Sequence, residues 1–212
     1  MIANYYTVKG YSESEFKINK SRFITYVNRI ETESDAAQFI DQIKKKHWNA
    51  THNCSAYTLG DQDQQQKADD DGEPSGTAGR PILEVIKKAA VKNTVIVVTR
   101  YFGGIKLGTG GLIRAYGKAA ANGLLTSGLV ERVLHTRLAI CLDYALQGSV
   151  ENSLRTGGYI IENKKFAEKV TLITLVKYGE EAAFAKKICD LTADRASIRH
   201  LEPAYAEIPV NP

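Results

Sequence analysis

The sequence predicts an α+β protein of two domains, and three observations support this fold class. The chain has 212 residues, of which 43% are hydrophobic and 25% charged, so it can bury one large or two small cores. Segments with strand-like alternation are interspersed with segments of helical spacing. After Gly128 the strand and helix patterns begin anew at His135. We therefore expect domains at residues 1–133 and 134–212.

The first elements are a hairpin, a helix and a strand. Apolar residues alternate at 16–18 and 23–27 on either side of a turn at 19–21, which indicates a hairpin. Residues 32–46 have helical spacing, with a capping arrangement of Thr32 and Asp35 at the start and lysines at the end. Residues 52–59 alternate as a strand that ends at Gly60, and neither of its faces is uniformly apolar. The polar stretch 61–67 is predicted to be a mobile loop.

The middle of the chain predicts a central strand between two helices. Pro81 suits the first turn of a helix, because its missing amide would have no partner there. Residues 94–99 are β-branched and apolar on both faces, as in a strand covered on both sides. Gly110 and Gly111 open a long helix that ends at Gly128.

The remainder of the chain predicts the order βαββαβ. A strand at 138–142 and a helix at 146–154 are followed by strands at 159–162 and 170–176, with residues 163–165 near the turn between them. A second helix at 184–191 and a strand at 197–201 complete the series. This order is that of ferredoxin-like domains, which serve many functions and therefore identify none.

Composition and charge exclude several classes of protein. The net charge is +4, and residues 1–133 hold 18 Lys and Arg against 14 Asp and Glu, while residues 134–212 hold 10 of each sign. This small excess favours a local basic surface and is too small for a protein that coats nucleic acid. Three widely spaced cysteines indicate no disulfide framework. No signal-like N-terminus and no apolar run of membrane-spanning length is present, so we expect a cytoplasmic protein.

Two glycine-rich loops, at 69–80 and 103–111, flank the predicted central strand. The second, KLGTGG, leads into the long helix, where free amides and the helix dipole favour an anion. It has neither the P-loop order nor the dinucleotide-binding context. The sequence predicts a phosphate site there, formed by amides and cations of the following residues: Arg80, Arg100, Lys106, Gly108, Thr109, Gly110, Gly111 and Arg114.

Aromatic residues beside this loop suggest a further contact. Tyr101 and Phe102 follow the central strand and would offer faces for a nucleobase to stack on. The alternative is that the loop is a tight packing turn, with Arg80 and Arg100 forming structural ion pairs with the acids of the first loop.

Those acids are the candidates for catalysis. Asp70, Asp71 and Glu73 would hold Mg²⁺ against substrate phosphates or supply a general base, and His52 is a weaker candidate base. The alternative is that the carboxylates order the loop by accepting backbone amides. His47, His52 and Cys54 lack the further ligand of a zinc site, so no metal site is predicted with them.

The strings DDGEPSGTAGRP and VTRYFGGIKLGTGGLIRAYGKAA closely resemble the signature of the YigZ/IMPACT family. The resemblance implies a first domain with the fold of the second domain of ribosomal protein S5 and a second, ferredoxin-like domain similar to the last domain of the translocation elongation factor. Eukaryotic IMPACT regulates a translation kinase through a scaffold partner, and that work involves an additional N-terminal domain, which we do not expect in this chain. The resemblance implies no settled activity.

Three functions are consistent with these observations. The first is a non-catalytic, anion- or RNA-binding regulator linked to translation or the ribosome, which we favour. The second is an enzyme that acts on a phosphorylated small molecule or nucleotide through Asp70, Asp71 or Glu73. The third is a regulator that binds another protein with its glycine-rich surface.

Overall fold

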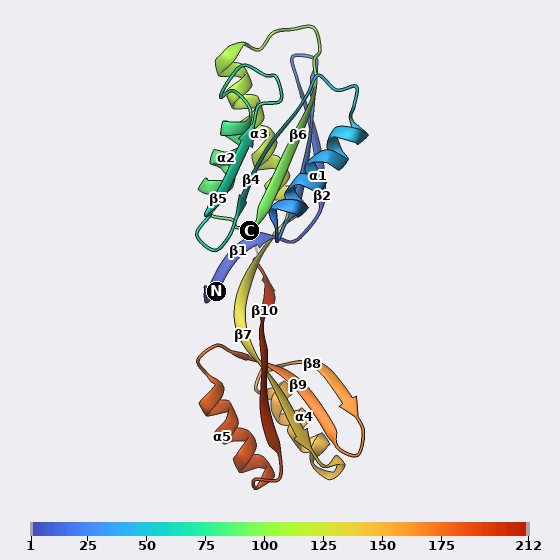
Figure 1. The fold of residues 1–212 in the computed structure, drawn as a ribbon, viewed down its shortest axis with the longest axis vertical. Coiled ribbons are helices and arrows are strands. Elements are labelled where there is room, and N and C mark those ends of the chain that lie inside the picture. Colours follow the sequence, from blue (N-terminus) through green and yellow to red (C-terminus); the bar gives the residue numbers. More distant parts are fainter. Residues whose placement is uncertain (1, 211–212) are drawn as a thin grey trace. The chain divides into compact units, whose positions relative to one another are not determined.

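The computed structural model describes residues 2–210, and their contacts form two compact units. The first unit consists of Tyr5–Glu131 together with residues 209–210. The second consists of Ile2–Asn4 and Arg132–Ile208. Helices and antiparallel sheets occur in both, which confirms the α+β class (Figure 1). No helix in the described range is long and apolar enough to cross a membrane.

The first unit is a five-stranded sheet in the order β2-β3-β6-β4-β5, in which every neighbouring pair is antiparallel. The central strand β6 is the predicted apolar run, extended to Tyr101. The elements of this unit, preceded by β1 (Asn4–Val8), are β2 (Ser12–Ile18), β3 (Ser21–Arg29), α1 (Glu33–Lys46), β4 (His52–Leu59), β5 (Gln65–Asp69), α2 (Gly79–Lys88), β6 (Thr94–Tyr101) and α3 (Gly108–Ser127).

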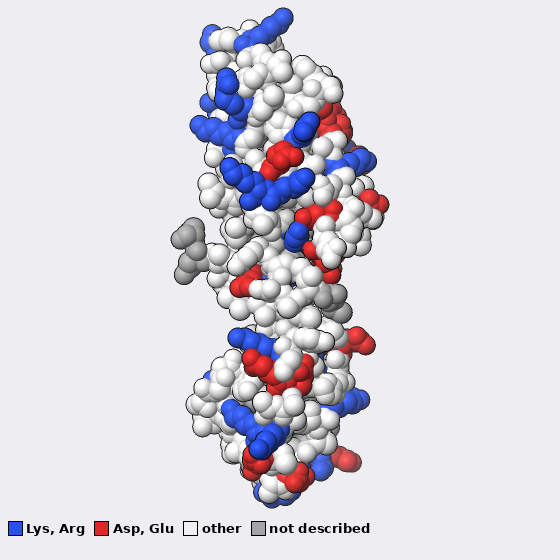
Figure 2. All heavy atoms as spheres, turned by 90° about the vertical axis from the view of Figure 1, so that its left-hand side faces the viewer, with Lys and Arg blue, Asp and Glu red and all other residues white. Residues whose placement is uncertain are grey.

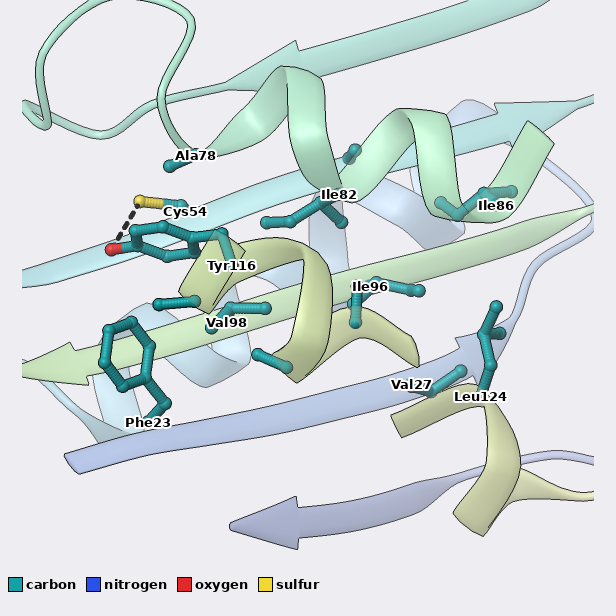
Figure 3. Close-up of a cluster of buried hydrophobic side chains, with 14 of the residues drawn as sticks. Phe23, Val27, Cys54, Ala78, Ile82, Ile86, Ile96, Val98, Tyr116 and Leu124 are labelled. Atoms are coloured by element: carbon teal, nitrogen blue, oxygen red, sulfur yellow. Dashed lines mark hydrogen bonds between the residues drawn. The ribbon is translucent and has the colours of Figure 1, made fainter. Parts of the chain in front are cut away.

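Each face of this sheet has its own hydrophobic core, because most residues of β3, β4 and β6 are buried on both sides. One core lies between the sheet and helices α2 and α3, and contains Phe23, Ile82 and Tyr116 (Figure 3). The other lies beneath α1 and contains Tyr26 and Phe39. The sequence did not indicate which face of residues 52–59 is buried, and in the structure both faces of β4 are buried.

Helices α2 and α3 begin at the same end of the sheet. Ala78 and Tyr116 lie together at one end of the core, and Ile86 and Leu124 lie at the other (Figure 3). A cavity lined by residues from the second halves of both helices, among them Val85 and Leu125, agrees with this arrangement. The positive ends of two helix dipoles therefore share one end of the sheet.

The predicted mobile loop at 61–67 is wrong in its second half. Residues from Gln65 belong to β5, which pairs with β4 at the edge of the sheet. Four of the five side chains of β5 are exposed, so the strand buries little and its sequence shows no apolar alternation. Backbone pairing with β4 maintains it without a hydrophobic face.

The second unit has the predicted order βαββαβ. Its elements are β7 (Leu129–Leu142), which begins in the first unit, α4 (Tyr144–Thr156), β8 (Ile160–Phe166), β9 (Val170–Lys177), α5 (Glu181–Thr192) and β10 (Ser197–Pro209). The sheet runs β1-β7-β9-β8, and β10 also pairs with β7. β8 extends beyond its predicted end at 162, through a bulge to Phe166, and the turn expected near residues 163–165 lies at 167–169.

Candidate functional site

Asp70, in the first glycine-rich loop, caps helix α2. Its carboxylate accepts the amides of Gly76, Ala78 and Gly79 at 2.7, 3.0 and 2.8 Å. Partial burial alone raises the pKa of Asp70, but the three amide hydrogen bonds outweigh it and hold this pKa below its ordinary value. A Cβ at Gly79 would lie 2.6 Å from the Asp69 amide, so glycine is required where the loop closes onto β5.

A buried ion pair links the first glycine-rich loop to the end of β6. One oxygen of Glu73 accepts from Arg100 Nη1 at 2.6 Å and from the Tyr116 hydroxyl at 2.7 Å. Glu73 is 7% exposed and Arg100 5% exposed, so both charges are out of solvent. Arg100 is therefore not available to a surface phosphate, which corrects its assignment to the phosphate site. The structural ion pair considered as the alternative is what the structure contains.

His52 and Cys54 lie beside this pair. Nδ1 of His52 donates to the Asp71 carbonyl at 2.8 Å, and Nε2 lies 3.8 Å from the second oxygen of Glu73. The Cys54 thiol contacts the Asp70 carbonyl and the Tyr116 hydroxyl (Figure 3). Burial raises the pKa of the Cys54 thiol and of the Tyr116 phenol, so both are protonated at neutral pH and neither is a ready nucleophile.

The carboxylates proposed for Mg²⁺ or base catalysis do not converge. Asp70 faces the amides of its own loop, and Glu73 faces Arg100 in the interior. Asp71 accepts from the Asn53 amide at 2.6 Å and pairs with Lys44 of α1 at 2.7 Å. Among residues 2–210 no three His, Cys, Asp or Glu side chains are grouped as ligands for a metal ion. These carboxylates thus order the loop, as in the alternative interpretation.

Tyr101 lies on the opposite side of the sheet from helices α2 and α3. Its side chain packs against the core beneath α1, and its hydroxyl bonds to His47 Nδ1 at 2.8 Å and to Asn49 at 3.2 Å. Successive strand residues point to opposite faces, so Tyr101 cannot share a face with Arg100. Its assignment as a stacking partner beside the second glycine-rich loop is therefore corrected.

His47 gives this side of the sheet a predicted pH dependence. Burial, followed by the charge of Lys46, lowers the pKa of His47 from its ordinary value of 6.5, and its Nε2 bonds to the Tyr26 hydroxyl. The unfolded chain therefore binds this proton more readily than the folded chain. We expect stability to be constant with respect to this group above pH 6.5 and to fall as the pH drops towards the lowered value. Urea denaturation between about pH 5 and 8 measures the free energy of unfolding at each pH. This free energy should change less with pH for His47→Gln than for the natural chain, and an equal pH dependence would contradict the prediction.

The start of helix α3 carries donors that no side chain caps. Leu107 occupies the N-cap position and has no side-chain hydrogen bond, and Gly108, Thr109 and Gly110 are exposed. Within the described residues no acceptor outside the helix receives these amides. The Arg114 Nη1 atom lies 3.6 Å from the point that a Cβ on Gly110 would occupy, so the guanidinium turns back towards the first turn. Amides and a cation thus face one exposed point.

Exposed cations extend from this point across α2 and α3. We define the basic layer as the exposed side chains of Arg80, Lys87, Lys88, Lys106, Arg114 and Lys118. Glu84 is the only acidic residue in α2 and α3, and none of the six cations forms an ion pair with a described residue. Figure 2 shows Lys and Arg prominent over much of the first unit with some Asp and Glu beside them, and both signs interspersed in the second. This surface attracts anions.

Comparison with known proteins places both units in one family. The model of the Impact N-terminal domain matches residues 19–124, and that of a domain of unknown function, DUF1949, matches residues 140–195. The chain is 50% identical over 211 residues to "IMPACT family member YvyE" of Bacillus subtilis, an alignment that covers 100% of this chain and 97% of that protein. The chain belongs to the IMPACT family.

One further member of the family and one solved structure are also similar to this chain over most of its length. The chain is 32% identical over 188 residues to "IMPACT family member YigZ" of Escherichia coli, covering 88% of this chain and 92% of that one. A crystal structure described as that of an hypothetical protein has a TM-score of 0.62 at 29% identity, covering 95% of this chain and 99% of that chain. The predicted IMPACT resemblance is thus confirmed over the whole chain.

Sequence reasoning missed two parts of this IMPACT-family site. Lys87, Lys88 and Lys118 were not recognised as members of a basic surface, although the helix from Gly108 to Ser127 contains only cations among its charged residues. Tyr116 was not recognised as part of the site, because its hydroxyl bond to Glu73 joins residues 43 positions apart and leaves no local signal. Of the predicted phosphate-binding cations, Arg80, Lys106 and Arg114 are exposed as required.

Proposed function

We propose that this IMPACT-family protein binds RNA through the phosphate backbone and acts as a non-catalytic regulator linked to translation or the ribosome. Membership of the family supports a regulatory role at the level of the family. The RNA phosphate contact is inferred from the chemistry of the first unit. The observation that carries it is the basic layer, whose six exposed cations have no ion-pair partner among the described residues.

The start of α3 supplies the proposed docking point for one phosphate. Three exposed amides and the positive end of the helix dipole stabilise a negative charge there, and the Arg114 guanidinium faces the same turn. Guanidinium–phosphate hydrogen bonds are charge-assisted and roughly twice as strong as neutral ones. The start of α2 cannot serve in the same way, because Asp70 already occupies its amides.

The interior of the site favours binding over catalysis. Glu73 is paired with Arg100 and Asp71 with Lys44, and Asp70 accepts hydrogen bonds from backbone amides, so each candidate carboxylate already has a partner. The strand order β10-β7-β9-β8 with two helices supports a ferredoxin-like second unit. We propose that this unit adds a further contact or a dimer surface.

Salt dependence tests the proposal directly. We expect the whole chain to bind an oligouridylate with an affinity that falls linearly on a log–log scale with salt, by about 0.7 per phosphate neutralised. The double variant Arg114→Glu/Lys118→Glu should bind more weakly by on the order of tenfold or more at low salt, with a smaller slope. Fluorescence anisotropy over about 50 to 200 mM salt measures both quantities.

A charge-matched variant separates a specific surface from net charge. Lys165 and Lys186 are exposed cations of the second unit without an ion pair among the described residues. Lys165→Glu/Lys186→Glu changes the net charge by the same amount and should reduce affinity much less. Equal loss in both double variants, or binding that does not change with salt, would reject the proposed site.

A further inference from the structure

Phe102 is a partly exposed aromatic ring on an anchored backbone. It follows β6, and 46% of it is exposed. Its amide donates to the Thr51 hydroxyl at 3.0 Å, and the next amide, that of Gly103, donates to the Ser21 hydroxyl at 3.2 Å. A Cβ at Gly103 would clash with the Lys20 backbone, so this segment packs directly against the β2–β3 turn. The backbone that carries the exposed Phe102 ring is therefore held in place by two hydrogen bonds and by close packing.

The buried guanidinium of Arg100 supports the Phe102 ring from below. Its central carbon lies 5.4 Å from the centre of the Phe102 ring and 5.6 Å from that of Phe23, which is fully buried. Glu73 holds one guanidinium nitrogen, while the Nε atom is buried with no hydrogen-bond partner among the described atoms. The attraction between this buried cation and the face of the Phe102 ring stabilises the ring in its position.

This arrangement places the Phe102 ring on the side of the sheet where the phosphate site lies. Arg100 faces helices α2 and α3, and its partner Glu73 also bonds to Tyr116 of α3. Ile105 and Ile113, which flank the start of α3 in sequence, are likewise exposed by 44% and 43%. Exposed apolar side chains therefore lie close in sequence to the uncapped amides of this helix.

We propose that Phe102 is a stacking platform for one unpaired base of a single-stranded RNA whose phosphates lie on the basic layer. The inference rests on the proposed function and adds to it that the ligand is single-stranded. Duplex RNA keeps its bases within the helix and offers none to a surface ring, whereas every unpaired base has a face that stacks on an aromatic side chain. Tyr101 takes no part, since its ring lies on the other side of the sheet.

Substitution of the ring tests the platform. Phe102→Ala should weaken binding of an oligouridylate by roughly 5- to 150-fold, the range for loss of one stacked base, with an unchanged salt slope. Binding of inorganic polyphosphate, which has no bases, should be unchanged. Phe102→Tyr should retain affinity for the oligouridylate, and Phe102→Leu should behave as Phe102→Ala. Circular dichroism melting identifies any variant that fails to fold.

A spectroscopic readout reports stacking itself. Trp48, the single tryptophan, is 83% exposed and is replaceable by Phe, which leaves Phe102→Trp as the only indole. Its fluorescence should be quenched by the oligouridylate and not by polyphosphate. If Arg114→Glu/Lys118→Glu abolishes binding while Phe102→Ala changes nothing, the phosphate site stands and the platform is rejected. If duplex and single strand bind equally, the platform is also rejected.

Discussion

Glu73→Ala is expected to destabilise the first unit by about 3–5 kcal/mol, because it leaves the buried Arg100 charge without its partner. It also removes the acceptor of the Tyr116 hydroxyl. The effect should appear in urea denaturation of the whole chain and in faster hydrogen exchange of β6 amides. Hydrogen exchange assigns the loss to the first unit, since β9 of the second should be unaffected.

Two further variants sharpen this result. Glu73→Gln keeps an oxygen for Arg100 and Tyr116 but no charge, so we expect a loss intermediate between the natural chain and Glu73→Ala. Glu84→Ala removes an exposed carboxylate of α2 and should change the free energy of unfolding by about 0.5 kcal/mol or less. A loss no larger for Glu73→Ala than for Glu84→Ala would refute the assigned role of the ion pair.

Asp70→Ala is expected to destabilise the first unit by about 2–4 kcal/mol, because the amides of Gly76, Ala78 and Gly79 lose their shared acceptor. Ala78 and Gly79 are buried, so water replaces the carboxylate poorly. Helix α2 would also lose its cap, and the loop between β5 and α2 should become susceptible to proteolysis. Limited proteolysis and urea denaturation measure the two effects.

The dependence of stability on pH in the acid range distinguishes a charged Asp70 carboxylate from a neutral capping group. Asp70→Asn keeps one acceptor oxygen and should lose less stability than Asp70→Ala. The pKa of Asp70 in the folded chain lies below its ordinary value of 3.8. The ionised carboxylate therefore contributes its full stability above pH 3.8, and this contribution is lost as the pH falls through the lower pKa of the folded chain. The gap between the natural chain and Asp70→Asn should therefore close only in acid. Asp41→Ala, an exposed carboxylate of α1, should have little effect at any pH.

Local patterns predicted most of the elements of this protein because their causes are local. The hairpin at 12–29 follows from alternation around Asn19 and Lys20, both of which have positive φ. The capping box of Thr32 and Asp35 starts α1 as predicted. Edge strand β5 and the longer β8 escaped prediction because both are mostly exposed, so backbone pairing rather than an apolar face maintains them.

The candidate site was predicted less well than the fold, for a reason that Arg100 and Asp70 illustrate. Both are charged residues near glycine-rich loops, and their local sequence is equally consistent with a phosphate, a metal or an internal partner. Arg100 lies 27 positions from Glu73, and only the pairing of β6 with β4 brings the two together. Arg114 differs because it lies about one turn along the same helix from its predicted site, which makes its position a local property.

By itself the sequence determined the α+β class, the order of most elements, membership of the IMPACT family and the donor-rich start of α3, since periodicity, turn residues and motifs act over a few positions. The tertiary structure decided which charges remain exposed. Side-chain direction alternates along β6, so Arg100 entered the core between Phe23 and Phe102 while Tyr101 turned to the other face. Arg100 is paired with the distant Glu73 and is buried, so the basic layer and the Phe102 ring form the surface that is exposed to a ligand.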